Sequence, residues 1–387
     1  MTGPARDAVR VSLAAGPQDL WARRAEWQAL VERNATHTVF QTLEWHCSWW
    51  RAFGEAARSL LLVAEAGGRL VGIAPLMVSQ HRLLGRKLRV VEFIGTHAAD
   101  YCDFIVDPDW PEAMPVLVDA LCARAREWDM IDLINLAETS TLPAHLPGAL
   151  RRRGYAAEAA RLYECPTRVL RDRAQDEQLL RKRYLRGRHA RLQREGRVRF
   201  EVYTQAAEIE ARLDAFFAQH IARWAGTPTP SFFHDARQRE FYRQKARLLG
   251  PKGWAMLSVL SLDDAPIAFH FGFEYGGRVY VIKPTFDPAH RERAPGMVQI
   301  KHLLEYAMAR NAAELDFTVG EERFKYHFAN HVRVNYAVRA HPRWMFYGVD
   351  RLLAFGRRVT RRGGSARRVA KRLLAPLLGE TLHRLGR

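Results

Sequence analysis

Cysteine is scarce in this chain, and long apolar runs are missing. The four cysteines, Cys47, Cys102, Cys122 and Cys165, lie far apart and form no CxxC pair. The sequence therefore predicts neither a zinc knuckle nor a disulfide framework, and such thiols suit a reducing cytoplasm. No segment reaches the roughly 18 apolar residues that a bilayer-spanning helix needs. The N-terminal segment lacks the apolar core of a signal peptide. We therefore expect a cytoplasmic protein that does not span the membrane.

Negative charge is also in short supply, since 60 Lys and Arg residues face 42 Asp and Glu residues for a net charge of +18. Two segments hold most of this excess. Residues 171–199 carry 11 basic and four acidic residues, and residues 351–387 carry 11 basic residues and one acidic residue. Because the basicity is local, each segment needs its own explanation.

The chain is long enough for two domains, and one succession of elements occurs twice. With 387 residues and 48% hydrophobic content, two separate cores are feasible. Each half shows a hairpin, a helix and a further strand, which predicts a mixed α/β fold of two tandem domains. The expected pieces are hairpins at 60–78 and 256–274, helices at 111–128 and from Pro295 on, strands at 130–136 and 315–319, and a connection at 141–164. The expected domains are residues 1–160 and 161–342, followed by a tail at 343–387.

The stretch from Gly276 to Phe328 reads as a ligand-binding unit. A turn at Gly276-Gly277 leads into the β-rich run 279–282, and Pro295-Gly296 then opens an amphipathic helix. Its apolar positions are expected to face a sheet, whereas Gln299, Lys301, His302 and Glu305 are expected on the solvated side. The first amides of such a helix have no partner within the helix, so they attract anions.

This unit resembles motif A of the GNAT superfamily of acyl-CoA transferases, in particular the cellulose-biosynthesis-associated acetyltransferase-like branch. The motif Q/R-x-x-G-x-G/A is matched by residues 291–296. Ala294 replaces the first glycine, and Pro295 occupies the position between the two glycines of the motif. The resemblance implies that acyl-CoA, typically acetyl-CoA, binds the C-terminal domain. The residues expected to hold its pyrophosphate are Arg291, Arg293, Gly296, Met297 and Val298.

Further segments of the chain are similar to the same branch. They are residues 40–50, 60–77, 181–196, 220–224 and 320–326, so that the resemblance covers about residues 38–340. The branch resembles the tandem GNAT fold of the Fem peptidyltransferases, which implies two GNAT-like domains here. Only the second copy has the Pro-Gly helix start with arginines ahead of it, so the donor is expected there.

Amide formation from a thioester needs a neutral amine, stabilisation of the oxyanion and a proton for the leaving thiolate. In GNAT proteins one strand separates from its neighbour, and the acyl donor inserts between the two. Pro284 is consistent either with this separation or with the end of the strand. Glu321 is the preferred acid/base, with Glu322 and His270 as further candidates and Tyr326 as a proton donor to the thiolate. The sequence favours a packed core histidine over a catalytic one at His270, and Tyr326 and Lys325 equally fit a half-buried ring and a surface cation. Lys283, Asp287 and Lys325 are expected substrate contacts.

Three other features bear on metal, RNA and membrane binding. His327 and His331 are four residues apart, but no third ligand of clear spacing follows, so no metal is expected. The basic run 181–196 is expected to be a largely solvated helix that steers an anionic substrate or, alternatively, contacts RNA. The tail mixes arginines with leucines, which fits either a helix on an anionic membrane surface or a flexible solubilising segment.

The sequence thus favours an N-acyltransferase that moves an acyl group from acyl-CoA to an amine, with a sugar or cell-envelope precursor as acceptor. Its expected location is cytoplasmic or peripheral at the inner membrane face. Two alternatives stay open: an aminoacyl-tRNA-dependent transferase of the Fem kind, with tRNA as partner, and a non-catalytic polysaccharide or envelope accessory protein. The altered loop at Ala294 admits the latter.

Overall fold

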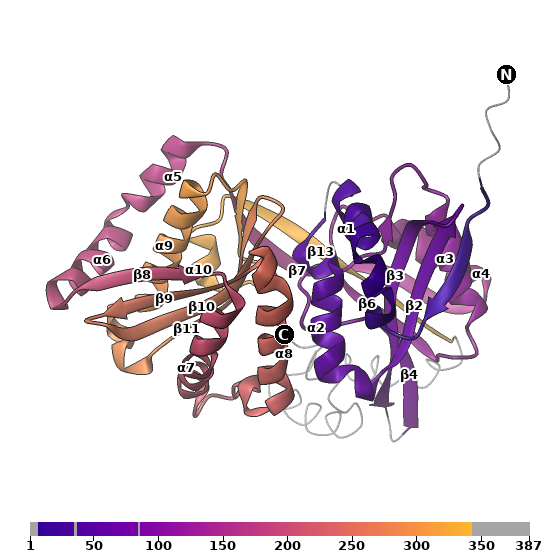
Figure 1. Cartoon of the computed structure of the whole chain (residues 1–387), viewed down its shortest axis with the longest axis horizontal. Coiled ribbons are helices and arrows are strands. Elements are labelled where there is room, and N and C mark those ends of the chain that lie inside the picture. Colours follow the sequence, from indigo (N-terminus) through magenta and orange to yellow (C-terminus); the bar gives the residue numbers. More distant parts are fainter. Residues whose placement is uncertain (1–6, 35–36, 84–85, 343–387) are drawn as a thin grey trace, which may run out of the picture.

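The computed structural model describes residues 7–34, 37–83 and 86–342. These residues form a continuous 13-stranded mixed sheet in the order β1-β2-β3-β4-β6-β13-β7-β12-β11-β10-β9-β8, with β5 beside β3. Figure 1 shows two lobes side by side, one built mainly from each half of the chain. The strands are β1 Arg10–Ala14, β2 Arg58–Ala66, β3 Arg69–Leu83, β4 Arg86–Phe93, β5 Ile105–Val106, β6 Met130–Leu136, β7 Tyr155–Val169, β8 Val198–Tyr203, β9 Ala255–Leu262, β10 Ala265–Tyr275, β11 Arg278–Phe286, β12 Glu314–Asp316 and β13 His331–Pro342.

Helices cover both faces of each lobe. In the first lobe α3 packs on β2 and β3 and contacts α4, which packs on β7 and β13 of the same face, whereas α1 packs on β3 from the opposite face (Figure 1). The helices are α1 Arg24–Arg33, α2 Leu43–Phe53, α3 Ala113–Ala123, α4 Leu142–Arg152, α5 Arg173–Leu180, α6 Arg183–Glu195, α7 Ala206–Trp224, α8 Ala236–Leu249, α9 Pro295–Ala309 and α10 Arg323–Tyr326. Among these residues no helix is long and apolar enough to cross a membrane.

The hairpins form where the turn residues predict them. Gly67 and Gly68 join β2 to β3 with φ values of 56° and 78°, a left-handed pair that glycine adopts without steric cost. In the second lobe Asp263 and Asp264 join β9 to β10 with φ values of 48° and 68°. Aspartate is among the few residues that tolerate this region. The predicted mixed α/β class is confirmed.

The segment 141–164 is not the simple connection that its prolines indicated. It forms α4 and most of β7. Pro143 lies in the first turn of α4, where the missing N–H costs nothing, and Gly154 ends the helix with φ 86°. Leu142, Leu146 and Leu150 recur at helical spacing and are fully buried, so packing outweighs the second proline at 147.

The two faces of the second lobe's sheet differ in what covers them. Along β10, Phe269 and Phe271 contact Phe216 of α7, with centroid separations of 6.2 and 6.4 Å. The alternate residue His270 lies on the other face, where α9 packs on β10 and β11. Pairing in this region therefore places α7 and α8 on one side of β11 and α9 on the other.

The solvated face expected for α9 is partly wrong. Gln299 is fully buried and its Nε2 donates to the Ser258 backbone oxygen at 3.2 Å, while Lys301 is only 7% exposed and pairs with Glu305. The reason is that α6 packs on the outer side of α9, so two flanks of the helix are covered. The expected stripe itself, including Ile300, Leu304 and Ala307, is buried.

Strands β7 and β13 run through both lobes. The first part of β13, from His331 to Asn335, pairs with the later part of β7, and the remainder lies between β7 and β6. Residue 160, where the sequence places a domain boundary, lies inside β7. The division at 160 stays a prediction, and the expected tail at 343–387 lies outside the described residues.

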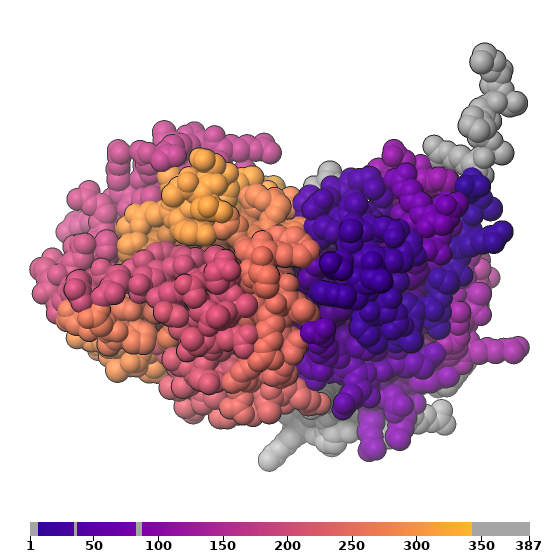
Figure 2. All heavy atoms as spheres, viewed as in Figure 1, coloured from indigo at the N-terminus to yellow at the C-terminus, as the bar shows by residue number. Residues whose placement is uncertain are grey.

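Helices also join the lobes. Trp45 of α2 contacts Phe241 of α8 edge-on at 5.9 Å, and Phe40 contacts Phe273 and Tyr280 at 6.0 and 5.9 Å. All five rings are buried. Figure 2 shows the lobes in contact along this seam. Such an aromatic interface fixes the halves against each other and so allows a site made by both.

Candidate active site between the lobes

Strands β11 and β12 part shortly after they begin. They pair in parallel only from Arg278 with Glu314 to Tyr280 with Asp316. Beyond Tyr280, β11 carries a bulge against β10, because Lys283 pairs with Phe271 whereas Val281 pairs with Gly272. A Cβ atom on Gly272 would lie 2.3 Å from the Tyr280 backbone oxygen, so glycine is needed there. The bulge and the end of β12 leave a gap beside β11.

Pro284 lies inside β11 and does not end it. It pairs with His270 of β10, and the strand continues to Phe286. Proline cannot donate to a ladder, yet beyond Tyr280 β11 pairs with β10 alone. The guanidinium of Arg223 donates to the Pro284 carbonyl at 2.9 Å. The parting thus begins three residues before Pro284.

A cavity of about 670 Å³ opens at this gap. Its size falls in the usual range of ligand sites, about 300–1,000 Å³. Both lobes contribute walls. The lining residues are His97, Ala98 and Asp100 of the first lobe, His220, Arg223, Trp224, Phe232, Phe241, Tyr242 and Lys245 around α7 and α8, Val281 to Pro284 of β11, and Thr318, Val319, Glu322, Phe324 and Lys325 after β12, with Thr229, Pro230 and Gln238 at the edge.

The cavity holds more basic than acidic side chains. Lys325 is buried, donates to the Val319 oxygen at 2.7 Å and pairs with Glu322 at 2.9 Å. Arg223 is held by Pro284 and by the Phe286 ring, 4.3 Å from its centroid. The remaining lysines, Lys245 and Lys283, have Asp100 as the carboxylate that favours their charged forms, with Glu322 also acting on Lys283.

Asp100 is the carboxyl group that the first lobe presents to this cavity. Burial raises its pKa, although the positive charges of Lys325, Lys283 and Lys245 favour the ionised form. Burial likewise lowers the pKa of Lys283, whose neighbour Lys325 acts in the same direction. Titratable groups with such opposed perturbations in one cavity are typical of catalytic sites.

Hydrogen bonds hold the segment that carries Asp100. Asn335 of β13 donates to the Asp100 backbone oxygen at 2.7 Å, and Asn135 of β6 donates to the Ala99 oxygen at 2.8 Å. The hydroxyl of Tyr101 donates to Asp316. Three strands therefore fix the loop, which keeps the backbone that carries the Asp100 carboxylate in one position.

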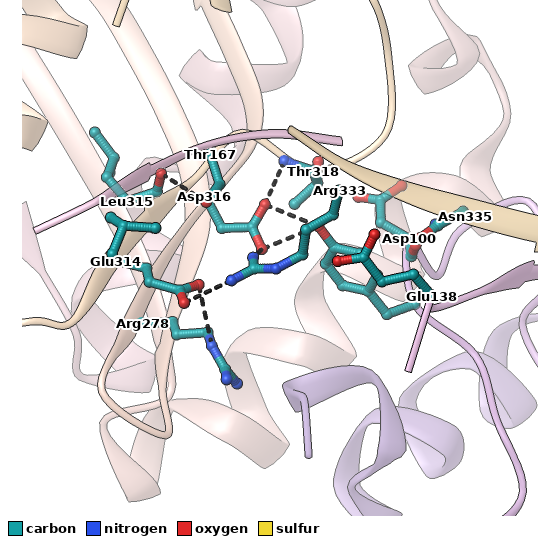
Figure 3. A network of polar contacts seen from close by, with 12 residues as sticks. Asp100, Glu138, Thr167, Arg278, Glu314, Leu315, Asp316, Thr318, Arg333 and Asn335 are labelled. Atoms are coloured by element: carbon teal, nitrogen blue, oxygen red, sulfur yellow. Dashed lines mark hydrogen bonds and ion pairs between the residues drawn. The ribbon is translucent and has the colours of Figure 1, made fainter. Parts of the chain in front are cut away.

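Below the gap lies a buried polar network, drawn in Figure 3. The Arg333 guanidinium lies between Glu314, at 2.6 Å, and Asp316, at 3.5 Å. Asp316 also accepts from the Thr318 amide at 2.7 Å, and burial raises its pKa to about 6. Arg278 pairs with Glu314 at 3.3 Å. This network secures the last residue of β12 at the point where the strands part.

The four predicted catalytic residues do not come together. Glu322 lines the cavity, whereas the exposed Glu321 does not. His270 is fully buried on the α9 face with Nδ1 3.4 Å from the Ser258 hydroxyl, and burial lowers its pKa to about 3, so it is neutral. Tyr326 is 41% exposed and donates to Glu164 at 2.6 Å, a bond that raises its pKa to about 12.

The predicted pyrophosphate site is at the start of α9, beyond the cavity lining. Ala294 adopts φ 51°, and its oxygen accepts from the amides of Met297 at 3.0 Å and Val298 at 3.4 Å, which leaves the Gly296 amide for an anion. Arg293 is engaged by Glu195 of α6. Arg291 is exposed and forms no ion pair with any described residue.

Arg223 and Phe286 lie between this helix start and the cavity. A methyl group on Gly296 would be 3.5 Å from Phe286, whose ring contacts Arg223, and Arg291 acts electrostatically on Arg223. Of the predicted substrate contacts, Lys283 and Lys325 line the cavity. Asp287 instead caps the 3-10 turn Pro288–Arg293 by accepting from the Ala289 amide at 2.9 Å.

Sequence reasoning missed the cavity residues Asp100, His97, Arg223 and Lys245. The first two belong to a loop of one lobe that faces a site of the other, so no local pattern reveals them. Lys245 did carry a signal. It occupies the apolar stripe of α8 that includes Phe241, Ala246 and Leu249, where a lysine is out of place. Within the described residues no three His, Cys, Asp or Glu side chains gather as for a metal.

Most of the second lobe is similar to a known family of domains. Residues 180–326 match the family model described as an acetyltransferase (GNAT) domain. This span contains the parted strands, α9 and most of the cavity wall. No curated protein sequence matches the chain.

Solved structures extend the likeness to both lobes. FemX is similar with a TM-score of 0.56 at 12% identity, over 81% of this chain and 95% of that one. The C-terminal domain of a putative lysylphosphatidylglycerol synthetase from Agrobacterium fabrum is similar with a TM-score of 0.53 at 14% identity, over 82% and 92%. L-PGS from Bacillus licheniformis has a TM-score of 0.53 at 12% identity, over 87% and 97%. The predicted arrangement of two tandem GNAT-like units is therefore the fold of this chain.

Proposed function

We infer that the chain is an N-acyltransferase that moves an acyl group from acyl-CoA to an amine. The observation that carries this proposal is the gap between β11 and β12 with a cavity inside it, in the segment that matches the acetyltransferase domain. A thioester arm inserted beside β11 would bring its carbonyl to the cavity. Arg291 and the Gly296 amide would hold the pyrophosphate, with Arg223 between them and the reacting end.

The chemistry proposed is direct attack of the amine on the thioester carbonyl, with loss of CoA thiolate. The attacking amine must lose a proton, and Asp100 and Glu322 are the carboxylates in the cavity that are placed to take it. Asp100 is preferred because it is held from three strands, whereas the Glu322 side chain is 59% exposed and paired with Lys325. Unpaired backbone amides of β11 along the gap would polarise the carbonyl.

Titration calorimetry with acetyl-CoA and with CoA tests the donor. Both are expected to bind with similar affinity, because the shared pyrophosphate provides most contacts. The substitution R291A is expected to weaken both roughly tenfold, as for loss of one charge-assisted contact. R10A, which removes an exposed arginine from β1 in the other lobe, is the matched control. Absence of binding by acetyl-CoA and longer acyl-CoAs would overturn the proposal.

The acceptor is proposed to be a sugar or cell-envelope precursor with a free amine. The resemblance to the polysaccharide-associated branch supports this choice, and the cavity is large enough for a monosaccharide. Work on such a precursor is compatible with a cytoplasmic enzyme or one attached to the inner membrane face. The choice of acceptor is tested by incubating the protein with acetyl-CoA and each of a panel of amino sugars. The free thiol of CoA that is released reports the rate of acyl transfer.

A second candidate is an aminoacyl-tRNA donor, and the surface of α6 favours it. Lys182, Arg183 and Arg188 are exposed around a shallow depression, Arg186 is exposed on the same helix, and none of the four forms an ion pair with any described residue. The fold likeness to FemX and to the two lysylphosphatidylglycerol synthetase structures fits this candidate. tRNA binding should then weaken steeply with salt, and the log–log slope should fall by about one for each arginine neutralised. Salt-independent or absent tRNA binding would remove this candidate.

A further inference from the structure

Lys245 is a buried cation without a matching anion. Its side chain comes from α8, is 2% exposed and lines the cavity. The ammonium lies 3.6 Å from the centroid of the Tyr242 ring and 4.0 Å from that of Phe241. It forms no hydrogen bond or salt bridge with any described residue. Ring faces attract a cation, but they do not replace the water that burial removes.

The other buried lysines among the described residues, Lys301 and Lys325, each have a partner that Lys245 lacks. Lys301 is 7% exposed and pairs with Glu305, and Lys325 is 5% exposed and pairs with Glu322. Each therefore has a carboxylate within direct contact. A buried lysine without one destabilises the fold, so its presence at a cavity wall calls for another explanation than packing.

The charges around Lys245 do not compensate it. Lys283 of β11 opposes its protonation, and Asp100 is the carboxylate that favours it. Asp100 serves Lys325 and Lys283 as well. Burial is the largest influence and lowers the pKa of Lys245 far below its usual range. Of the remaining titratable groups in the cavity, His97 and His220 add no negative charge, and Glu322 is engaged by Lys325.

We propose that the acyl acceptor carries an acidic group, a phosphate or a carboxylate, and that this group binds between Lys245 and Lys283. The proposal rests on the proposed acyl transfer and names the class of acceptor for the same cavity. An anion at this position supplies the missing charge to two lysines at once. It also directs the amine of the acceptor toward the parted strands, because Lys283 belongs to β11 at the bulge.

The aromatic wall fits this class of acceptor. Phe232 lies under the Lys283 ammonium at 4.8 Å, and Trp224, Phe241 and Tyr242 line the same side. A sugar ring or a short carbon chain would pack on these rings while its acidic group reaches the lysines. An acceptor without an acidic group would supply no anion to either lysine. The site would therefore favour acidic acceptors over neutral ones, because a neutral acceptor leaves these polar groups unpaired.

Three related acceptors test the inference: glucosamine, glucosamine 6-phosphate and muramic acid. They present the same amine with no acidic group, with a phosphate and with a carboxylate. At least one of the two acidic acceptors is expected to exceed glucosamine in kcat/KM by roughly 10- to 100-fold, the usual range for a charge-assisted contact. Which of them does so identifies the acidic group.

The variant K245M keeps an unbranched side chain one atom shorter and removes the ammonium group. It is expected to remove most of the preference for the acidic acceptor, measured as the ratio of its kcat/KM to that of glucosamine, and to raise the melting temperature, because a lysine whose charged form is disfavoured by burial is gone. K87M, at an exposed lysine of β4, is the control and should change neither. A loss of kcat for all three acceptors in K245M would instead make Lys245 part of the chemistry and overturn the inference.

Calorimetry with the same three compounds separates the two proposals. If acetyl-CoA fails to bind but glucosamine 6-phosphate or muramic acid binds in a Lys245-dependent way, acyl transfer is wrong and the anion site stands. If acetyl-CoA binds and glucosamine is acylated, but neither acidic compound binds or reacts better, the inference fails and acyl transfer stands. If none of the compounds binds or reacts, the inference fails as well.

Discussion

The hydroxyl group of Tyr101, in the first lobe, donates to the carboxylate of Asp316, in the second, with distances of 2.9 and 3.0 Å to its two oxygens. Both side chains are buried. Asp316 is the last residue of β12 to pair with β11, and Tyr101 directly follows Asp100. One hydrogen-bonded pair thus ties the proposed proton acceptor to the place where the strands part.

The variant Y101F tests this link. Loss of the hydroxyl leaves a buried carboxylate short of a donor, which should cost about 1–3 kcal/mol in the free energy of unfolding. We also expect kcat to fall while acetyl-CoA affinity is kept, because the loop that carries Asp100 loosens. Urea denaturation and steady-state kinetics measure the two effects. Y155F is the control, since that hydroxyl has no hydrogen-bond partner among the described residues, and an equal effect of both variants would refute the link.

The variant D100N tests the proton acceptor. Removal of a general base should lower kcat/KM by roughly 100-fold or more and remove the acidic limb of its pH profile. Acetyl-CoA binding, measured by calorimetry, should be unchanged. E321Q, at the exposed carboxylate outside the cavity, should behave as wild type. If E322Q rather than D100N abolishes turnover, Glu322 takes the proton and the assignment of Asp100 is wrong.

Acid should destabilise the protein through its buried histidines. The pKa of His270 is lowered to about 3 by burial, from an unfolded value of 6.5, so the neutral ring stabilises the fold above pH 6.5 and this contribution is lost as pH falls toward 3. For one such group the loss at pH 5 is about 2 kcal/mol. The pKa values of His46 and His220 are likewise lowered to about 3.

The corresponding experiment compares urea unfolding at pH 7.5 and pH 5. H270Q should lose about 2 kcal/mol less than wild type between these two values, whatever its stability at pH 7.5. H234Q, at an exposed histidine, is expected to follow wild type. If H270Q loses as much free energy of unfolding between pH 7.5 and pH 5 as the wild type does, His270 is protonated in the folded protein at pH 5.

Ala294 occupies a backbone conformation that suits glycine. Its φ of 51° lies in the left-handed region, where a Cβ atom costs roughly 1–2 kcal/mol. We expect A294G to raise the free energy of unfolding by about 1 kcal/mol. A289G, at an exposed residue of the preceding 3-10 turn, should lower it. Thermal unfolding of both variants decides, and destabilisation by A294G would contradict the reading of this loop.

Local patterns predicted the elements of the fold well. Alternation and glycine turns located β2 and β3, and Pro295-Gly296 marked the first residue of α9. These features depend on residues that are neighbours in the sequence, and for this reason they can be predicted from it. The strand expected at 315–319 ends at Asp316 instead, because Thr318 turns the chain with φ 56° while Asp316 accepts its amide hydrogen bond.

Fewer residues of the candidate site could be predicted from the sequence, for a physical reason. Lys283, Glu322 and Lys325 were expected from one segment and do line the cavity. Asp100 comes from nearly 200 residues away, and its position depends on hydrogen bonds from Asn335 and on the contact of Tyr101 with Asp316. His270 and Glu321 are candidates by residue type and by their positions in or just after an expected strand. Type does not say on which face of a strand or loop a side chain lies.

The insertion of β13 between β6 and β7 has a consequence for biosynthesis. Residues 336–342, among the last that the structure describes, supply the partner that β6 needs on its inner edge. A nascent chain emerging from the ribosome would hold that edge open until residues 336–342 have been translated. The first lobe must therefore complete its sheet after the second lobe has begun to form. Until then the unpaired edge of β6 is exposed, and a chaperone is expected to bind the nascent chain at this edge.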